Sequence, residues 1–181
     1  MKTYRLCLNL LALLLVGTLL GCSTSTKSPD VSDSIRTSLD QAGLTEVSIS
    51  QDRDKGVVTL GGHVASDAEK LQAASLATNL AGAQVVSNEI AVLPVGAEED
   101  AKMMNLALDE GIESNLHAAL INEKLDEDVN HTVKNHVVTL TGDVNSQSKR
   151  ARAEVVAAAV PNVHQVVNEL QVKEQKATSS K

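Results

Sequence analysis

The chain has 181 residues, a formal net charge of −7, one Tyr, and neither Trp nor Phe. The negative charge argues against non-specific binding to nucleic acid and against simple adhesion to anionic lipid, because both need many basic side chains. The near absence of aromatic rings argues against stacking platforms for sugars or single-stranded nucleic acid.

The first 22 residues have the layout of a bacterial signal peptide. Lys2 and Arg5 make a positive start, and Leu6–Leu20 is an apolar run of about fifteen residues, which is short for a membrane span. The run ends in Leu-Leu-Gly-Cys, which resembles a lipobox with cleavage before Cys22 and lipidation of its thiol, palmitate included. The alternative is an ordinary signal peptide with an incidental cysteine. Ser23, in place of Asp, indicates the outer membrane by analogy with enterobacterial sorting.

One stretch of the chain occurs twice, at a spacing of 80 residues. Gly56–Val64 reads GVVTLGGHV and His136–Val144 reads HVVTLTGDV, and the match continues without a gap to Val92 and Val172. A fixed internal period predicts two copies of one small fold. Modules of about 60 residues are marginally stable alone, so we expect the copies to pack together or to share a partner surface.

The first module is assigned to residues 31–94, after a polar tether at 23–30. Asp30 or Ser32 can cap a first helix, which ends at Gly43. A strand over 46–51, a turn and a strand over 57–64 form a hairpin, and Ser66-x-x-Glu69 is a capping box that opens a second helix. That helix closes at Gly82, and a strand over 85–93 completes the order α-β-β-α-β. The inner face predicted for the second helix is Ala73, Leu76, Ala77 and Leu80.

The second module, residues 105–173, repeats this order after a linker at 95–104. The acidic run Glu98–Asp100 is interpreted as a solvated helix start. Pro161-Asn162 replaces Ala81-Gly82, and Asn can take the left-handed conformation expected of that glycine. Residues 174–181 form a polar tail. The remaining elements are a helix with Leu108, Ile112, Leu116 and Leu120 on one face, strands near 128–133 and 136–144, a helix capped by Ser146 with Ala153, Val156, Ala157 and Val160 inside, and a strand over 166–172.

This ordered set of elements, present twice, resembles the BON (bacterial OsmY and nodulation) family. The marks are the strand Val-Val-Thr-Leu-x-Gly-x-Val, the helix after it, and the closing Val-x-Asn-x-[Ile/Leu]-x-Val at 86–92 and 166–172. The similarity covers nearly all of residues 31–173. It implies an α+β fold of two tandem α-β-β-α-β modules, each a three-stranded sheet with two helices packed on it.

A lipobox followed by two such modules is similar to the dual-BON lipoproteins of Gram-negative bacteria. The resemblance implies a non-enzymatic, lipid-anchored protein on the periplasmic side of the outer membrane. It also implies binding of envelope components, phospholipid above all, in envelope maintenance or osmotic-stress protection. The alternative is a protein-interaction adaptor that docks an envelope or secretion complex, and a weaker third is a sensor of small ions or stress. No cofactor and no nucleic-acid partner are expected.

A basic cluster marks the second module only. Lys149, Arg150 and Arg152 lie in the first turns of the helix capped by Ser146, where free N–H groups and basic side chains could together hold an anion such as a lipid phosphate. The alternative is ordinary exposed charge. We find no Ser/His/Asp order, phosphate loop or paired carboxylates, so no catalytic residue is predicted.

Polar and glycine residues at core positions receive structural interpretations. Asn88 and Asn168 share strand parity with the core valines, which favours buried clamps over ligand contacts. Gly62 and Gly142 are expected to allow close approach of a helix or a sharp bend.

Metal binding has little support in the sequence. Both cysteines, Cys7 and Cys22, precede the modules, so we expect neither an internal disulfide nor a Cys-based metal site. His131 and His136 flank the second hairpin turn and could approach each other. They lack a supporting carboxylate pattern, so no metal site is predicted.

Overall fold

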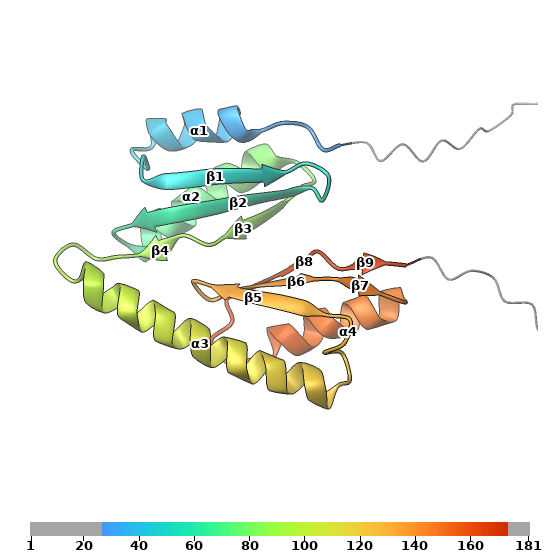
Figure 1. The fold of residues 1–181 in the computed structure, drawn as a ribbon. Helices are drawn as coiled ribbons and strands as arrows, with labels where there is room; N and C mark the ends of the chain where they lie inside the picture. The colour runs from blue at the N-terminus through green and yellow to red at the C-terminus, as the bar shows by residue number, and fades with distance from the viewer. Residues whose placement is uncertain (1–26, 174–181) are drawn as a thin grey trace, which may run out of the picture.

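The computed structural model describes residues 27–173, which form two copies of one α+β unit (Figure 1). The predictions for the signal segment, for Cys22 and for the tail at 174–181 lie outside the described residues. Within the described part, no helix is both long and apolar enough to cross a membrane.

The first module has the predicted order, with its last strand in two pieces. β2 is the central strand, antiparallel to β1 and parallel to β3 and β4. α1 and α2 contribute to one core cluster with the sheet, which places both helices on the same face. The elements are α1 (Ser32–Gln41), β1 (Val47–Asp52), β2 (Val57–Val64), α2 (Asp67–Ala81), β3 (Val85–Asn88) and β4 (Ala91–Val92).

The second module repeats this arrangement, with an additional break in its central strand. β6 pairs antiparallel with β5 and parallel with β8, and β7 pairs parallel with β9. The segment predicted as a linker is partly helical, because α3 begins at Glu98 as the acidic run indicated. The elements are α3 (Glu98–Asn122), β5 (Asn130–Lys134), β6 (Val137–Thr141), β7 (Asp143–Val144), α4 (Gln147–Ala158), β8 (Gln165–Asn168) and β9 (Gln171–Val172).

Each module has its own aliphatic core, and the inner face of α2 differs from the prediction at one position. Leu80 is 39% exposed, whereas Ala81 is buried. The buried residues of α2 are Ala73, Ala77 and Ala81, which follow each other at four-residue spacing and form a stripe. Leu80 lies beside this stripe, toward solvent. The small alanine side chains allow α2 to lie close to the sheet.

Three helix ends follow the predicted chemistry, and the start of α1 follows it in part. The Ser66 and Ser146 hydroxyls accept the N–H of Glu69 at 3.3 Å and of Lys149 at 3.2 Å, which confirms both N-caps. Asn162 has φ of 67°, close to the 65° of Gly82, as expected from the repeat. At α1 the prediction holds in part. The N-cap residue is Val31, which has no side-chain cap, but the Asp30 carboxylate accepts the Ser32 N–H at 3.2 Å. The Gln51 carboxamide oxygen on β1 accepts the Val31 N–H at 3.2 Å.

The repeated glycines mark a bend where two backbone segments come together. Gly62 and Gly142 have φ of 81° and 126°. A Cβ atom on Gly62 would lie 2.1 Å from the carbonyl oxygen of Glu46, and one on Gly142 would lie 2.3 Å from that of Asp128. The close approach is therefore to the segment before the first strand of each module, and not to a helix.

α3 connects the two modules. It begins beside β4 of the first module and continues along the second (Figure 1). Its buried residues Ile112, Leu116 and Leu120 belong to the core of the second module. The first half of the helix therefore lies along the junction, and the second half completes the fold of module two.

Candidate functional site

The three residues of the predicted anion site each bond to a different segment of the protein. Lys149 forms an ion pair with Asp128, before β5, and Arg152 forms one with Glu123, after α3. The Arg150 guanidinium donates to the carbonyl oxygen of Asn168 at 3.1 Å. The Arg152 side chain remains 62% exposed, but that of Lys149 is only 22% exposed. The structure does not gather the three charges around one point.

The two core asparagines are clamps, and one of them is incomplete. The Asn168 amide donates to the carbonyl oxygen of Arg150 at 3.2 Å, and its oxygen accepts the Leu170 N–H at 3.2 Å. The strand end is thereby tied to the start of α4, as predicted. Asn88 makes the equivalent bond to the carbonyl oxygen of Lys70 at 3.4 Å, but its side-chain oxygen is buried without a partner.

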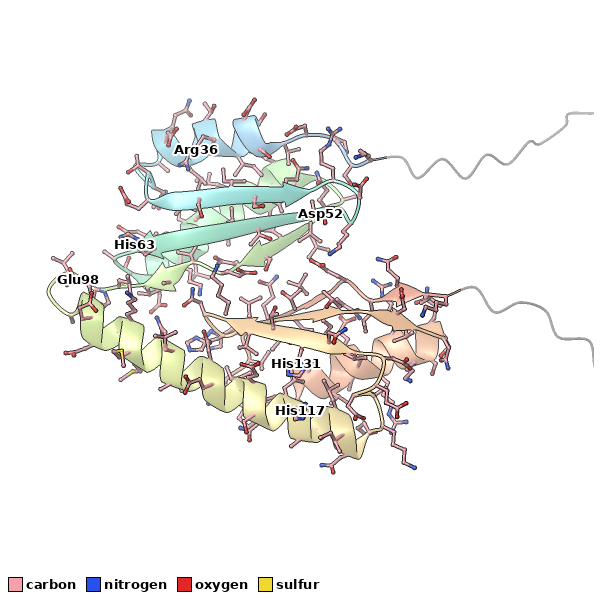
Figure 2. The ribbon with its side chains drawn as sticks, viewed as in Figure 1. Arg36, Asp52, His63, Glu98, His117 and His131 are labelled. Atoms are coloured by element: carbon pink, nitrogen blue, oxygen red, sulfur yellow. The ribbon has the colours of Figure 1, made fainter. Side chains whose placement is uncertain are left out.

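The histidines form two pairs that the sequence did not indicate. His131 lies beside His117 with ring centroids 6.0 Å apart (Figure 2), and His136 lies edge-on to His164 at 4.8 Å. The expectation that His131 and His136 approach each other was wrong, since each lies beside a different histidine. Burial lowers the pKa of both His131 and His136. No group of three or more His, Cys, Asp or Glu within residues 27–173 could hold a metal ion.

The two modules meet along β3 and β8, where one glutamine takes the place of a strand partner. The Gln165 side-chain amide donates to the carbonyl oxygen of Val86 at 2.6 Å, and its oxygen accepts the Asn88 N–H at 3.0 Å. These are the groups that a neighbouring strand would bond. Gln165 therefore covers part of the free edge of β3, a surface that otherwise invites unwanted pairing.

The turn between β5 and β6 supplies a second link. The Asn135 side chain donates to the carbonyl oxygen of Glu89 in the first module at 2.7 Å. The turn is itself held by Asp109 of α3, whose carboxylate oxygens accept the N–H groups of Asn135 at 2.7 Å and His136 at 2.8 Å. The turn, α3 and the end of β3 thus form one connected unit.

Ion pairs and a small apolar cluster complete the junction. Lys55 pairs with Glu169 at 2.6 Å, and this hydrogen bond raises the pKa of the lysine. Lys134 pairs with Glu89 at 3.3 Å. A cluster separate from both cores joins one residue of the first module to two of the second: Val57, Val137 and Val167.

The junction residues were missed by the sequence interpretation, although the repeat contained a signal for them. Aligned at the 80-residue spacing, Gln165 stands where the first copy has Val85, and His136 stands where it has Gly56. Two copies that each form the same core can differ at positions that face the other copy.

Comparisons with known proteins agree with the repeated fold. The BON domain family model matches residues 28–94 and again 108–174. The chain is 31% identical over 137 residues to osmotically-inducible protein Y of Escherichia coli K12, covering 75% of this chain and 67% of that protein.

Two solved structures of CdsD, a structural protein of the type III secretion system of Chlamydia trachomatis, are also similar. The C-terminal domain matches at a TM-score of 0.33 and 13% identity, over 80% of this chain and 66% of that chain. The other matches at 0.36 and 12%, over 77% and 90%. A likeness at these scores carries no argument about function.

Proposed function

Because the chain belongs to the BON domain family, with two BON domains in tandem, we propose that it is a non-enzymatic protein of the bacterial cell envelope. A lipid on Cys22 anchors it to the outer membrane on the periplasmic side, and it binds envelope components, phospholipid above all. The lipobox supports the anchor. The similarity to osmotically-inducible protein Y supports a role in envelope maintenance or osmotic-stress protection.

The observation that carries lipid contact is a group of exposed apolar side chains at the start of α3. Val95 is 87% exposed, Met103 64%, Met104 65% and Leu106 50%. Apolar side chains gathered on a surface helix mark a protein-interaction or membrane-interaction site. The flexible methionines fit irregular apolar surroundings such as acyl chains. This half of α3 therefore supplies the apolar contact.

Charge decides which lipids suit this surface. The first turn of α3 is acidic, at Glu98–Asp100, and repels anionic headgroups. The basic cluster of Lys149, Arg150 and Arg152 is proposed as a separate headgroup contact, because it lies near the other end of α3, where Arg152 pairs with Glu123. Two of its three members, Lys149 and Arg152, would exchange a carboxylate partner for a phosphate, so the net gain in free energy is small. The apolar contact by α3 is accordingly the larger contribution.

Vesicle flotation tests the lipid contact. A chain that starts at residue 27 is used, so that the anchor cannot contribute, with zwitterionic and anionic vesicles. We expect the protein to float with vesicles, and Met103→Ser with Met104→Ser to reduce the bound fraction severalfold. Leu80→Ser, which removes an exposed leucine from α2, is the matched control and should bind normally.

The same assay separates the two proposed contacts. Lys149→Glu with Arg150→Glu should weaken binding to anionic vesicles more than to zwitterionic ones. If this double substitution leaves binding to both kinds of vesicle unchanged, the basic cluster is not a headgroup site. If the unaltered chain floats with neither kind of vesicle, the lipid contact is disproved.

Mass spectrometry of the native N-terminus tests the anchor independently. The expected species begins at Cys22 and carries acyl groups. An unmodified Cys22 would contradict the anchor without affecting the flotation result.

The adaptor function is the second candidate, and the open strands favour it. β1 and β5 are the outer strands on the sides of their sheets away from β3 and β8, and an extended segment of a partner could pair with such an edge. Crosslinking in cells followed by mass spectrometry distinguishes the two functions. Protein crosslinks at β1 or β5, together with absent flotation, would favour the adaptor.

A further inference from the structure

A pocket of about 450 Å³ lies where the two modules meet. This volume falls within the range of roughly 300–1,000 Å³ that is typical of small-molecule sites. Its walls come from α2, β3, β4 and α3, from the turn before β6 and from the start of β8. Much of the surface is aliphatic, with Leu71, Ile90, Val92 and Val137 among the lining residues.

Polar groups in this pocket lack partners within the protein. The side-chain oxygen of Asn88 and the Nε2 atom of His136 are buried and make no hydrogen bond. None of the ion pairs within residues 27–173 includes Lys70, which also lines the pocket. A buried polar atom without a partner costs about 1–3 kcal/mol, so the Asn88 oxygen and the His136 Nε2 atom would both gain from hydrogen bonds to a molecule that enters this cavity.

The Lys70 and His136 side chains belong to one electrostatic environment. Burial lowers the pKa of Lys70, against the opposing effect of Asp67 and Asp109. Burial also lowers the pKa of His136, and the charges of His164 and Lys70 add to this effect. Both cationic forms would be stabilised by an anion. Asp109 does not fill this role fully, because its two oxygens already accept N–H groups from the turn.

The backbone at His136 is strained. Its φ is 68°, the same as that of Gly56 at the equivalent position of the first module. A residue with a Cβ atom in this conformation costs on the order of 1 kcal/mol relative to glycine, and such strain concentrates at functional sites. In the first module, Gly56 takes this positive φ without strain, because glycine has no Cβ atom. The imidazole at this position lines the pocket, and its Nε2 atom has no hydrogen-bond partner there.

We propose that the pocket between the modules binds a small carboxylic acid with an apolar body and a hydroxyl or amino group close to the carboxylate. The carboxylate bonds to Lys70 and His136, the hydroxyl or amino group donates to the Asn88 oxygen, and the body lies on Ile90 and Val137. Asp67 lines the pocket and Asp109 bonds to the backbone of His136, and both repel a carboxylate, so the acid end lies between the Lys70 and His136 side chains. This inference does not depend on membrane contact and stands if flotation fails.

Calorimetry with three related probes tests the ligand chemistry. Full-length protein in zwitterionic lipid nanodiscs is titrated with 3-hydroxyoctanoate, octanoate and 1,3-octanediol, and empty nanodiscs serve as the blank. We expect 3-hydroxyoctanoate to bind most tightly. Octanoate, without the donor for Asn88, should bind about fivefold more weakly, and the diol, without the carboxylate, at least tenfold more weakly.

Variants of the protein test which residues cause these differences in affinity between the probes. Lys70→Gln should weaken the binding of both acids, 3-hydroxyoctanoate and octanoate, about tenfold. Lys27→Gln, at an exposed lysine away from the pocket, is the matched control and should leave the affinities for both acids unchanged. Asn88→Ala should reduce the affinity for 3-hydroxyoctanoate to that for octanoate, with octanoate unaffected. Circular dichroism verifies folding. If Asn88→Ala does not fold, the comparison of the two acids on the unaltered protein answers the same question.

Two results would overturn the proposal. The first is heat equal to the nanodisc blank for all three probes, which would mean that the pocket holds only water. The second is acid binding that Lys70→Gln leaves unchanged, which would place the acid elsewhere on the protein.

Discussion

At the scale of single residues, a few backbone positions decide whether each module can close. Gly142 interrupts the central strand of the second module, and Gly62 holds the same position in the first. At both, a side chain would collide with a carbonyl oxygen of the preceding segment. Because this contact is to backbone, it cannot be relieved by a rotamer change. The positive φ and the lack of space for a Cβ atom together require glycine at both positions.

We predict that Gly142→Ala lowers the free energy of unfolding by roughly 3 kcal/mol. The added Cβ would lie 2.3 Å from the carbonyl oxygen of Asp128, at a φ of 126°. Urea denaturation followed by circular dichroism measures the change. A loss below about 0.5 kcal/mol, the range of ordinary surface substitutions, would show that the strand can shift without cost.

Histidine burial predicts that stability depends on pH. Burial lowers the pKa of His131 below its ordinary value of 6.5, with His117 adding to this effect and Glu113 opposing it. Below about pH 6.5 the unfolded chain therefore binds more protons than the folded chain. The contribution of neutral His131 to the free energy of unfolding should be fully present above this pH. It should be lost as the pH falls through the pKa of the folded state.

Denaturation at pH 7.5, 6.5 and 5.5 measures this dependence, and His131→Gln should make it shallower. His136, whose pKa is also lowered, accounts for part of the slope that remains. An identical slope in the variant and the unaltered protein would exclude His131 as a contributor.

At the scale of elements, the helices are specified by their ends and by narrow apolar faces. α2 and α4 begin with serine caps, and α2 buries a stripe of alanines. α3 differs, since its first half lacks buried residues and its 25 residues include Gly111. A helix of this kind is stabilised mainly by packing of its second half.

Gly111→Ala is predicted to stabilise the protein by about 1 kcal/mol. The glycine lies inside α3 without a positive φ, and a Cβ there would meet nothing within 4 Å. The change should raise the melting temperature by roughly 2–4 °C, measured by differential scanning calorimetry. A decrease would indicate that α3 bends or loosens at this residue.

At the scale of the whole molecule, the modules are joined by few but directional contacts. Gln165 and Asn135 bond to backbone groups of the first module, and two ion pairs and three valines surround them. Hydrogen bonds of this kind set the orientation of the modules. The buried apolar area in the small valine cluster adds modest stability.

We predict that Gln165→Val, which installs the residue type of the first copy, exposes the edge of β3. The Asn88 N–H loses its acceptor, so its hydrogen exchange should accelerate by at least tenfold, while amides of the β5–β6 ladder keep their protection. Exchange measured by NMR tests this. Gln171→Val on β9, whose side chain bonds within its own module, is the control. Unchanged exchange at Asn88 would show that the junction does not depend on Gln165.

The sequence alone determined most of the architecture, because the information was local and present twice. Alternation of Val and Leu defined the buried face of each strand, and the serines and glycines defined helix ends. The exact spacing of the copies even predicted the positive φ of Asn162 from that of Gly82. The error at Leu80, and the departure at the start of α1 where Gln51 of β1 bonds Val31 and Ser32, arose where packing of one element against another outweighed the local pattern.

Only the tertiary structure decided how the copies meet and what lies between them. Periodicity records which face of an element is buried, but it does not record which edge of one module contacts the other. Gln165, Asn135 and Lys70 have no periodic signature, and the histidine pairs depend on strand register and helix placement. The ion pairs of the basic cluster likewise join segments about twenty or more residues apart. For the same reason the pocket is a property of the assembled pair of modules and of neither copy alone.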